Sequence, residues 1–194
     1  MLAAAAVGFA VWMVTSDRDD GEFRPDELLE SEANVAAAKL IRDNYALFEL
    51  YYLMDYDQNT HFQPEPYGLE PEDGYYSLKP GVIGYDSVEQ IFELADSTFK
   101  PNIAEEIKMF SPFTDEGKPV YIERDGKIGI NETFEPKKDY DLKWGDVPIT
   151  LTFDSETKCM IEITLTDSDG GEVIKQINME KEQDGVWRLE NIVF

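Results

Sequence analysis

The sequence predicts an α+β fold, in which a long N-terminal helix and short helices pack on a curved antiparallel sheet. Two observations carry this prediction. Apolar residues recur with the 3.6-residue period of an amphipathic helix over residues 26–52, and after residue 120 they alternate with the two-residue period of a strand. Helices followed by an antiparallel meander of four to six strands are typical of a helical layer covering one face of a sheet.

The long helix is expected to begin after Pro25-Asp26. Acidic residues crowd its first turn, where they complement the positive end of the helix dipole. A helix with one broad apolar face can cover one side of a sheet. The predicted face comprises Leu28, Leu29, Val35, Ala36, Leu40, Ile41, Leu47, Phe48, Tyr51 and Tyr52.

Short helices and hairpins follow in order. Ser87 and Gln90 form a capping-box pattern that starts one helix, and Pro101 suits the first turn of the next. Asp125-Gly126 separates two short alternating segments and therefore predicts a tight hairpin. Further strands are expected over residues 149–166, 172–180 and 186–189.

Residues 55–85 are predicted to form a long loop, because eight proline and glycine residues interrupt any regular element. The segment carries six acidic residues, one lysine and five tyrosines. Tyrosine gives contact area with a polar tip, so a loop of this composition is a candidate protein-binding surface. The alternative is that the loop only packs its tyrosines on the sheet. The predicted partner-binding residues, within residues 62–85, are Glu70, Glu72, Asp73, Tyr75, Tyr76 and Tyr85.

The composition of the 194 residues excludes several classes of function. The net charge of −24 repels nucleic-acid phosphates and anionic membrane surfaces. The chain has one cysteine, Cys159, and one histidine, His61, so an intramolecular disulfide and a metal centre built from several such residues are excluded. Cys159 is expected to be a buried strand residue and His61 an ordinary loop residue. We predict no catalytic residue, no metal site and no cofactor.

Two acidic segments were compared with the calcium-binding EF-hand loop, and neither matches. Asp167 to Glu172 lacks the ligands required at the fifth and twelfth positions, and is better explained as a glycine-rich hairpin turn. Asp55 to Asn59 is followed by Thr60, where the loop needs glycine. Weak calcium binding by the acidic surface stays open. A hydrolase built on two carboxylates is the least favoured alternative, because nothing in the sequence singles out one pair.

Residues 1–16 are predicted to be a signal or membrane-anchor segment, because Met1 to Thr15 are uncharged and almost wholly apolar. An acidic linker over residues 17–25 follows, and residues 26–194 are expected to form a single domain. This organisation predicts an extracytoplasmic protein that is either secreted or anchored to the outer face of the cytoplasmic membrane.

Three stretches resemble the family of secreted inhibitors of bacterial cell-wall DL-endopeptidases, the IseA type. They cover residues 75–94, 99–110 and 121–131, and Trp144 with Trp187-Arg188-Leu189 resembles the ending. The resemblance extends over approximately residues 40–194. It implies a non-enzymatic protein that binds NlpC/P60-type catalytic domains and covers their cysteine active-site cleft. The acidic tyrosine-bearing loop is expected to meet a basic or polar cleft on that enzyme.

The order of elements is also similar to that of cystatin-like and NTF2-like folds. This is a fold analogy, which carries no function by itself. It leaves open a second function, an NTF2-like extracytoplasmic module for small-molecule binding or assembly. The pocket of such a module would lie between the long helix and the sheet, lined by Tyr45, Phe48 and Tyr52.

Overall fold

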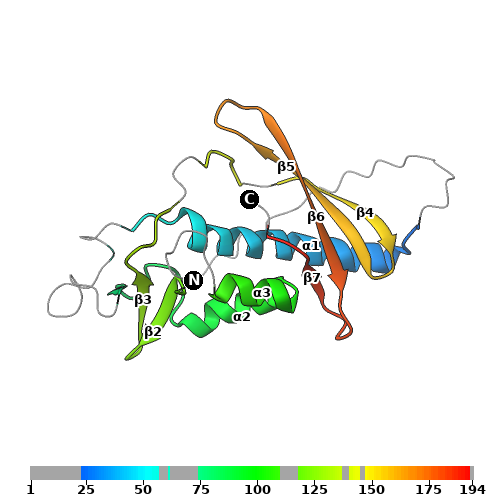
Figure 1. The fold of residues 1–194 in the computed structure, drawn as a ribbon. Coiled ribbons are helices and arrows are strands. Elements are labelled where there is room, and N and C mark those ends of the chain that lie inside the picture. The colour runs from blue at the N-terminus through cyan, green and yellow to red at the C-terminus, as the bar shows by residue number, and fades with distance from the viewer. Residues whose placement is uncertain are drawn as a thin grey trace, which may run out of the picture.

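The computed structural model describes residues 23–56, 61, 74–109, 118–136, 140–144 and 147–192. One long helix, α1, runs along the molecule, with a three-stranded sheet near its C-terminal end and a four-stranded sheet crossing its N-terminal half (Figure 1). The α+β class predicted from the sequence is confirmed. The elements are α1 (Glu27–Phe48), η1 (Glu49–Leu53), β1 (Tyr75–Ser77), α2 (Val88–Thr98), α3 (Pro101–Met109), β2 (Tyr121–Arg124), β3 (Lys127–Asn131), β4 (Ile149–Ser155), β5 (Lys158–Thr166), β6 (Glu172–Lys181) and β7 (Trp187–Leu189).

The strands form two antiparallel sheets, with orders β1-β3-β2 and β4-β5-β6-β7, where the sequence predicted one. The chain leaves the first sheet at a turn in which the Phe134 amide donates to the Asn131 carbonyl. It joins the second sheet at Lys143, whose amide donates to the Thr166 carbonyl over 2.8 Å. The strand β1 was also missed, because three residues are too few to show a two-residue period. Residues 55–85 therefore contain a regular element.

Helix α1 begins where the sequence predicts. Asp26 is its N-cap and accepts a 2.8 Å hydrogen bond from the Leu29 amide. The predicted apolar face is largely confirmed, but Leu28 and Val35 are exposed to 79% and 72%. These two residues lie on the opposite side of the helix from Ala33, which is fully buried. The predicted face left out Ala33 and Ala37, which are fully buried and whose small side chains let the sheet approach the helix.

The C-terminal end of α1 continues as the π-helical turn η1, and a buried tyrosine network ties this turn to the three-stranded sheet. The Tyr121 hydroxyl donates to the Leu50 carbonyl over 2.6 Å and lies 2.6 Å from the Tyr56 hydroxyl. Either hydroxyl can be the donor in the contact between Tyr56 and Tyr121, and the Tyr56 hydroxyl also lies 3.1 Å from Met54 Sδ. The Tyr51 ring meets the Tyr121 ring edge-on at 5.4 Å. Burial raises the pKa of all three hydroxyls.

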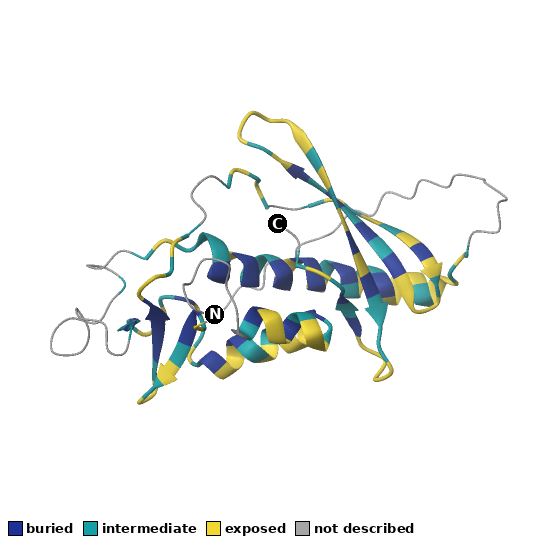
Figure 2. Cartoon of the chain, in the orientation of Figure 1, coloured by how far each residue is buried: buried dark blue, intermediate teal, exposed yellow. Residues whose placement is uncertain are grey.

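The short helices are capped as predicted. Ser87 accepts from the Gln90 amide, and the Gln90 side chain accepts from the Asp86 amide. Glu123 of β2 accepts a further 3.2 Å hydrogen bond from the Val88 amide, so the three-stranded sheet also holds the start of α2. The outer faces of α2 and α3 are exposed, and their inner faces are buried (Figure 2).

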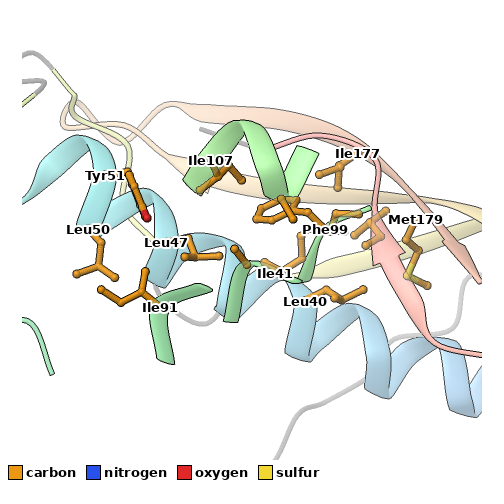
Figure 3. Packing of buried hydrophobic residues seen from close by; sticks show 14 of the residues in the cluster. Leu40, Ile41, Leu47, Leu50, Tyr51, Ile91, Phe99, Ile107, Ile177 and Met179 are labelled. Carbon is orange, nitrogen blue, oxygen red and sulfur yellow. The ribbon is translucent and has the colours of Figure 1, made fainter. Parts of the chain in front are cut away.

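The core lies where α1, the short helices and the four-stranded sheet meet. Ile41 of α1, Phe99 between α2 and α3, and Ile177 and Met179 of β6 pack together there (Figure 3). Cys159 of β5 is buried as predicted, and burial raises the pKa of its thiol to about 12. None of the helices in the described part of the chain is long and apolar enough to cross a bilayer.

Ion pairs join α1 and the segment between α2 and α3 to the edge of the four-stranded sheet at β6 and β7. Glu32 of α1 pairs with Lys181 of β6 at 2.6 Å and accepts a 3.1 Å hydrogen bond from the Trp187 indole of β7. The hydrogen bond from Lys181 lowers the pKa of Glu32. Lys100, between α2 and α3, pairs with both Glu180 and Glu190. The N-terminal half of α1 is therefore fixed to the sheet by charged contacts as well as by its alanines.

We predict that Tyr121→Phe lowers the free energy of unfolding by about 1 to 3 kcal/mol, because it removes the buried hydroxyl that donates to the Leu50 carbonyl and contacts the Tyr56 hydroxyl. Urea unfolding followed by circular dichroism measures the change. Tyr45→Phe is the control, since no hydrogen bond found among the described residues uses the Tyr45 hydroxyl, and we expect a change below about 0.5 kcal/mol. Equal effects of the two substitutions would contradict the network.

The buried network also predicts a loss of stability at alkaline pH. The unfolded chain ionises tyrosine near pH 10, whereas the raised pKa values of Tyr51, Tyr56 and Tyr121 keep these residues protonated in the folded state. Their contribution is therefore complete below pH 10 and falls as the pH rises above it. An ultraviolet absorbance titration should show late-ionising tyrosines that ionise together with the loss of native circular dichroism. Ionisation of all ten tyrosines near pH 10 in a folded protein would refute this.

Candidate functional site

Two grooves border the three-stranded sheet, one beside each end of β3. The larger, the hairpin groove, has a volume of about 310 Å³ and lies between residues 78–86 and the β2–β3 turn. The smaller, the aromatic groove, has a volume of about 160 Å³. The hairpin groove is lined by Leu78, Lys79, Pro80, Gly81, Ile83, Tyr85, Asp86, Asp125, Gly126, Lys127 and Ile128. The aromatic groove is lined by Asp55, Tyr56, Tyr76, Ile130, Asn131, Glu132, Phe134 and Pro136.

The hairpin groove owes its shape to the predicted turn. Asp125 and Gly126 both have positive φ, at 51° and 70°, as a type I′ hairpin turn requires. Buried Leu78 and Ile128 give the groove an apolar floor. Charged residues of both signs line it as well. Such a groove suits an apolar side chain of a partner better than it suits a ligand of one charge.

The aromatic groove is shaped by the turn that follows β3. The Asn131 side chain accepts hydrogen bonds from the amide and the hydroxyl of Thr133, both at 2.9 Å. The Glu132 amide donates to the Gly74 carbonyl at the start of β1. These bonds hold Glu132 and Phe134 at the groove, where the Phe134 ring meets the Tyr56 ring at 6.1 Å and 68°. The two aromatic residues line one side of the groove, and the acidic residues Asp55 and Glu132 also line it.

The predicted partner-binding residues divide into three groups. Tyr76 lines the aromatic groove and Tyr85 lines the hairpin groove, and both are half-buried. Burial, with the negative charges of Asp43 and Glu49, raises the pKa of Tyr85. Tyr75 is buried instead. The acidic members of the set, Glu70, Glu72 and Asp73, lie outside the described residues.

The burial of Tyr75 corrects its assignment as an exposed anchor. Its hydroxyl donates to the Pro119 carbonyl over 3.0 Å. Its register partner on β3 is Asn131, and diagonally across from it lies Gly129, where a Cβ atom would lie only 3.3 Å from Tyr75 Cβ and 3.2 Å from Ile122 Cγ1. The missing side chain of Gly129 therefore makes room for Tyr75 to pack across the sheet. The composition of the segment could not show this, because the space depends on a residue far along the chain.

Aromatic rings pack against one another at the place where the sequence predicted a small-molecule pocket between the helix and the sheet. Phe48 is fully buried, stacks on Tyr52 at 5.1 Å and meets the edge of Tyr140 at 4.8 Å. Tyr45 stacks on Trp144 at 5.1 Å. The Trp144 indole donates to the Tyr140 hydroxyl over 2.5 Å. The aromatic side chains of residues 140–144 therefore pack on the C-terminal half of α1.

In the part of the chain that the structure describes, the Asp167 turn and His61 make contacts within the fold. The Asp167 carboxylate accepts from the amides of Asp169 and Gly171, at 2.9 and 2.7 Å, so it closes the β5–β6 turn as predicted. Within the described ranges, no group of three or more histidine, cysteine, aspartate or glutamate side chains is placed to hold a metal. His61 lies edge-on to Tyr56, and its carbonyl accepts from the Lys79 amide. These two contacts tie His61 to Tyr56 and to Lys79, which lines the hairpin groove.

No protein-family model matches this chain, and no curated protein shows significant sequence similarity to it. Function therefore has to be argued from the chain's own residues and their arrangement.

We predict that Phe48→Ala lowers the free energy of unfolding by about 3 to 5 kcal/mol, because it empties the centre of the aromatic cluster. Leu28→Ala on the same helix removes an exposed side chain, and we expect less than about 0.5 kcal/mol from it. Thermal or urea unfolding compares the two variants. A small effect of Phe48→Ala would mean that the space is an open pocket after all.

Proposed function

We propose that the protein is a non-enzymatic binding protein that acts outside the cytoplasm, and that its partner is the catalytic domain of an NlpC/P60-type peptidoglycan DL-endopeptidase. The observation that carries the proposal is the position of Tyr76 and Tyr85. Each borders a groove on the same small sheet. In sequence, the acidic segment that ends at Asp73 directly precedes β1 of that sheet.

The three-stranded sheet offers what a protein-binding surface needs. Tyr76 and Tyr85 are half-buried, so their backbones are fixed while part of each side chain stays accessible. Prepositioned aromatic side chains bind a partner with little further loss of conformational entropy. The concave surface beside each ring can receive a side chain from the partner. The buried tyrosine network behind the sheet keeps this surface in place.

The charge distribution supports a basic partner. Several cations of the described part of the chain are already engaged within it: Lys108 contacts Asp96 and Glu105, and Arg188 makes a bidentate pair with Asp184. With a net charge of −24, the chain has far more carboxylates than its cations can neutralise. Opposite charge accelerates association and selects against acidic partners.

The sequence resemblance supplies the identity of the proposed partner and the mode of action. The stretches that carry it include β1, the start of α2 and the β2–β3 hairpin, which are the elements around the two grooves. In this proposal the protein covers the cysteine active-site cleft of the hydrolase and performs no reaction itself. Export through the apolar segment at residues 1–16 would bring it to the cell wall. The small-molecule alternative is less favoured, because aromatic rings pack against one another where its pocket was predicted.

We expect the purified protein to slow peptidoglycan lysis by an NlpC/P60 catalytic domain at micromolar concentration, as measured by turbidity, and to retain that domain in a pull-down. The double variant Tyr76→Ser with Tyr85→Ser should weaken binding about 10-fold or more, since aromatic anchors dominate such interfaces. Binding should also weaken as salt is added.

The control is Leu28→Ser, which changes an exposed residue of α1. It should bind as the unchanged protein does. Unretarded lysis at micromolar protein, together with no retention of the catalytic domain, would refute the proposed function.

A further inference from the structure

We propose that the aromatic groove binds one lysine or arginine side chain of the partner. This inference deepens the proposed function and rests on it for the identity of the partner. The recognition chemistry itself follows from the residues that line the groove. Those that the structure describes combine aromatic residues with carboxylates, and none of these described lining residues is a lysine or arginine.

The aromatic wall suits a cation. Rings of Tyr56, Tyr76 and Phe134 line the groove. A cationic head over such a ring is attracted by the negative face of the π-system. The Tyr56 ring is held in place because its hydroxyl is bound to Tyr121 at 2.6 Å, and the Phe134 ring meets it at 68°, forming a corner. The wall is therefore largely formed before a ligand arrives.

Two exposed carboxylates complete the site. Asp55 follows η1 and Glu132 follows β3, so they reach the groove from separate elements. The turn held by Asn131 fixes the backbone of Glu132. Lys118 approaches Glu132 from the side of Gly74, since both side-chain ends lie within 3.5 Å of the Cβ position of Gly74. Lys118 does not line the groove, and Asp55 adds a second negative charge there.

The neighbouring hairpin groove differs from the aromatic groove in its size and in the charges of the residues that line it. It is about twice as large and is lined by Lys79 and Lys127 as well as by acids, so it has no preference for a cation. The volume of about 160 Å³ in the aromatic groove limits its ligand to a single side chain. Buried Asn131 is already satisfied by Thr133. The ligand is therefore selected by the rings and the two carboxylates.

The binding test uses three small probes with the full chain: Nα-acetyl-arginine amide, Nα-acetyl-lysine amide and the neutral Nα-acetyl-norleucine amide. NMR titration should show the cationic probes shifting ring signals of Tyr76 and Phe134. We expect them to bind at least about 5-fold more tightly than the neutral probe, and less tightly as salt is added. Equal binding of charged and neutral probes would overturn the inference.

Two matched double variants remove two charges each, and a single variant removes one ring. Asp55→Asn with Glu132→Gln should weaken binding of the cationic probes about 3- to 10-fold, and Phe134→Leu should weaken it by a similar factor. The control, Glu156→Gln with Asp169→Asn, makes the same charge change in exposed turns of the four-stranded sheet and should alter binding less than about 2-fold. Circular dichroism checks that every variant is folded. Equal losses in both pairs would also overturn the inference.

The same variants separate this inference from the proposed function. If the cationic probes bind and the NlpC/P60 domain does not, the groove chemistry stands and the proposed partner is wrong. If the protein slows lysis and the Asp55→Asn, Glu132→Gln variant slows it equally well, the proposed function stands and the groove is not the point of recognition.

Discussion

The hydrogen bond from Tyr121 to the Leu50 carbonyl is the contact on which the placement of the three-stranded sheet depends. It joins the middle of the chain to the end of the long helix. The bond is buried, so breaking it would leave a buried polar group without compensation from solvent. Because the Tyr56 hydroxyl lies 2.6 Å from the Tyr121 hydroxyl, the segment after η1 is fixed by the same network. Both grooves border the sheet that this network holds, so their geometry depends on it.

We assign different roles to the two sheets. The four-stranded sheet packs on the alanine-rich half of α1 and is tied to it by Glu32, Lys181 and Trp187, which favours a purely structural role (Figure 1). The three-stranded sheet is small, and its first strand has three residues. It brings aromatic rings and charges from three separate segments to one surface. We interpret it as the recognition part of the molecule.

Local signals were enough to predict much of this fold, and long-range packing explains the errors. The start of the long helix near Asp26, the cap Ser87 and the Asp125-Gly126 hairpin depend on neighbouring residues, and all three are confirmed. The assignment of Tyr75 to a surface failed because Gly129, some fifty residues later, makes room for it. The sequence also did not show that Tyr140 and Trp144 pack against Phe48 and Tyr45, where a pocket was predicted. The aromatic groove was missed for the same reason, since Asp55, Tyr76 and Glu132 meet only in the folded chain.

The central claim is that a partner is recognised by the three-stranded sheet. Hydrogen exchange of the full chain, measured with and without an NlpC/P60 catalytic domain, tests it most directly. Residues 74–86 and 118–136 should become protected, while the strands β4 to β7 exchange as they do in the free protein. Protection confined to the four-stranded sheet, or none anywhere at saturating partner, would contradict the account.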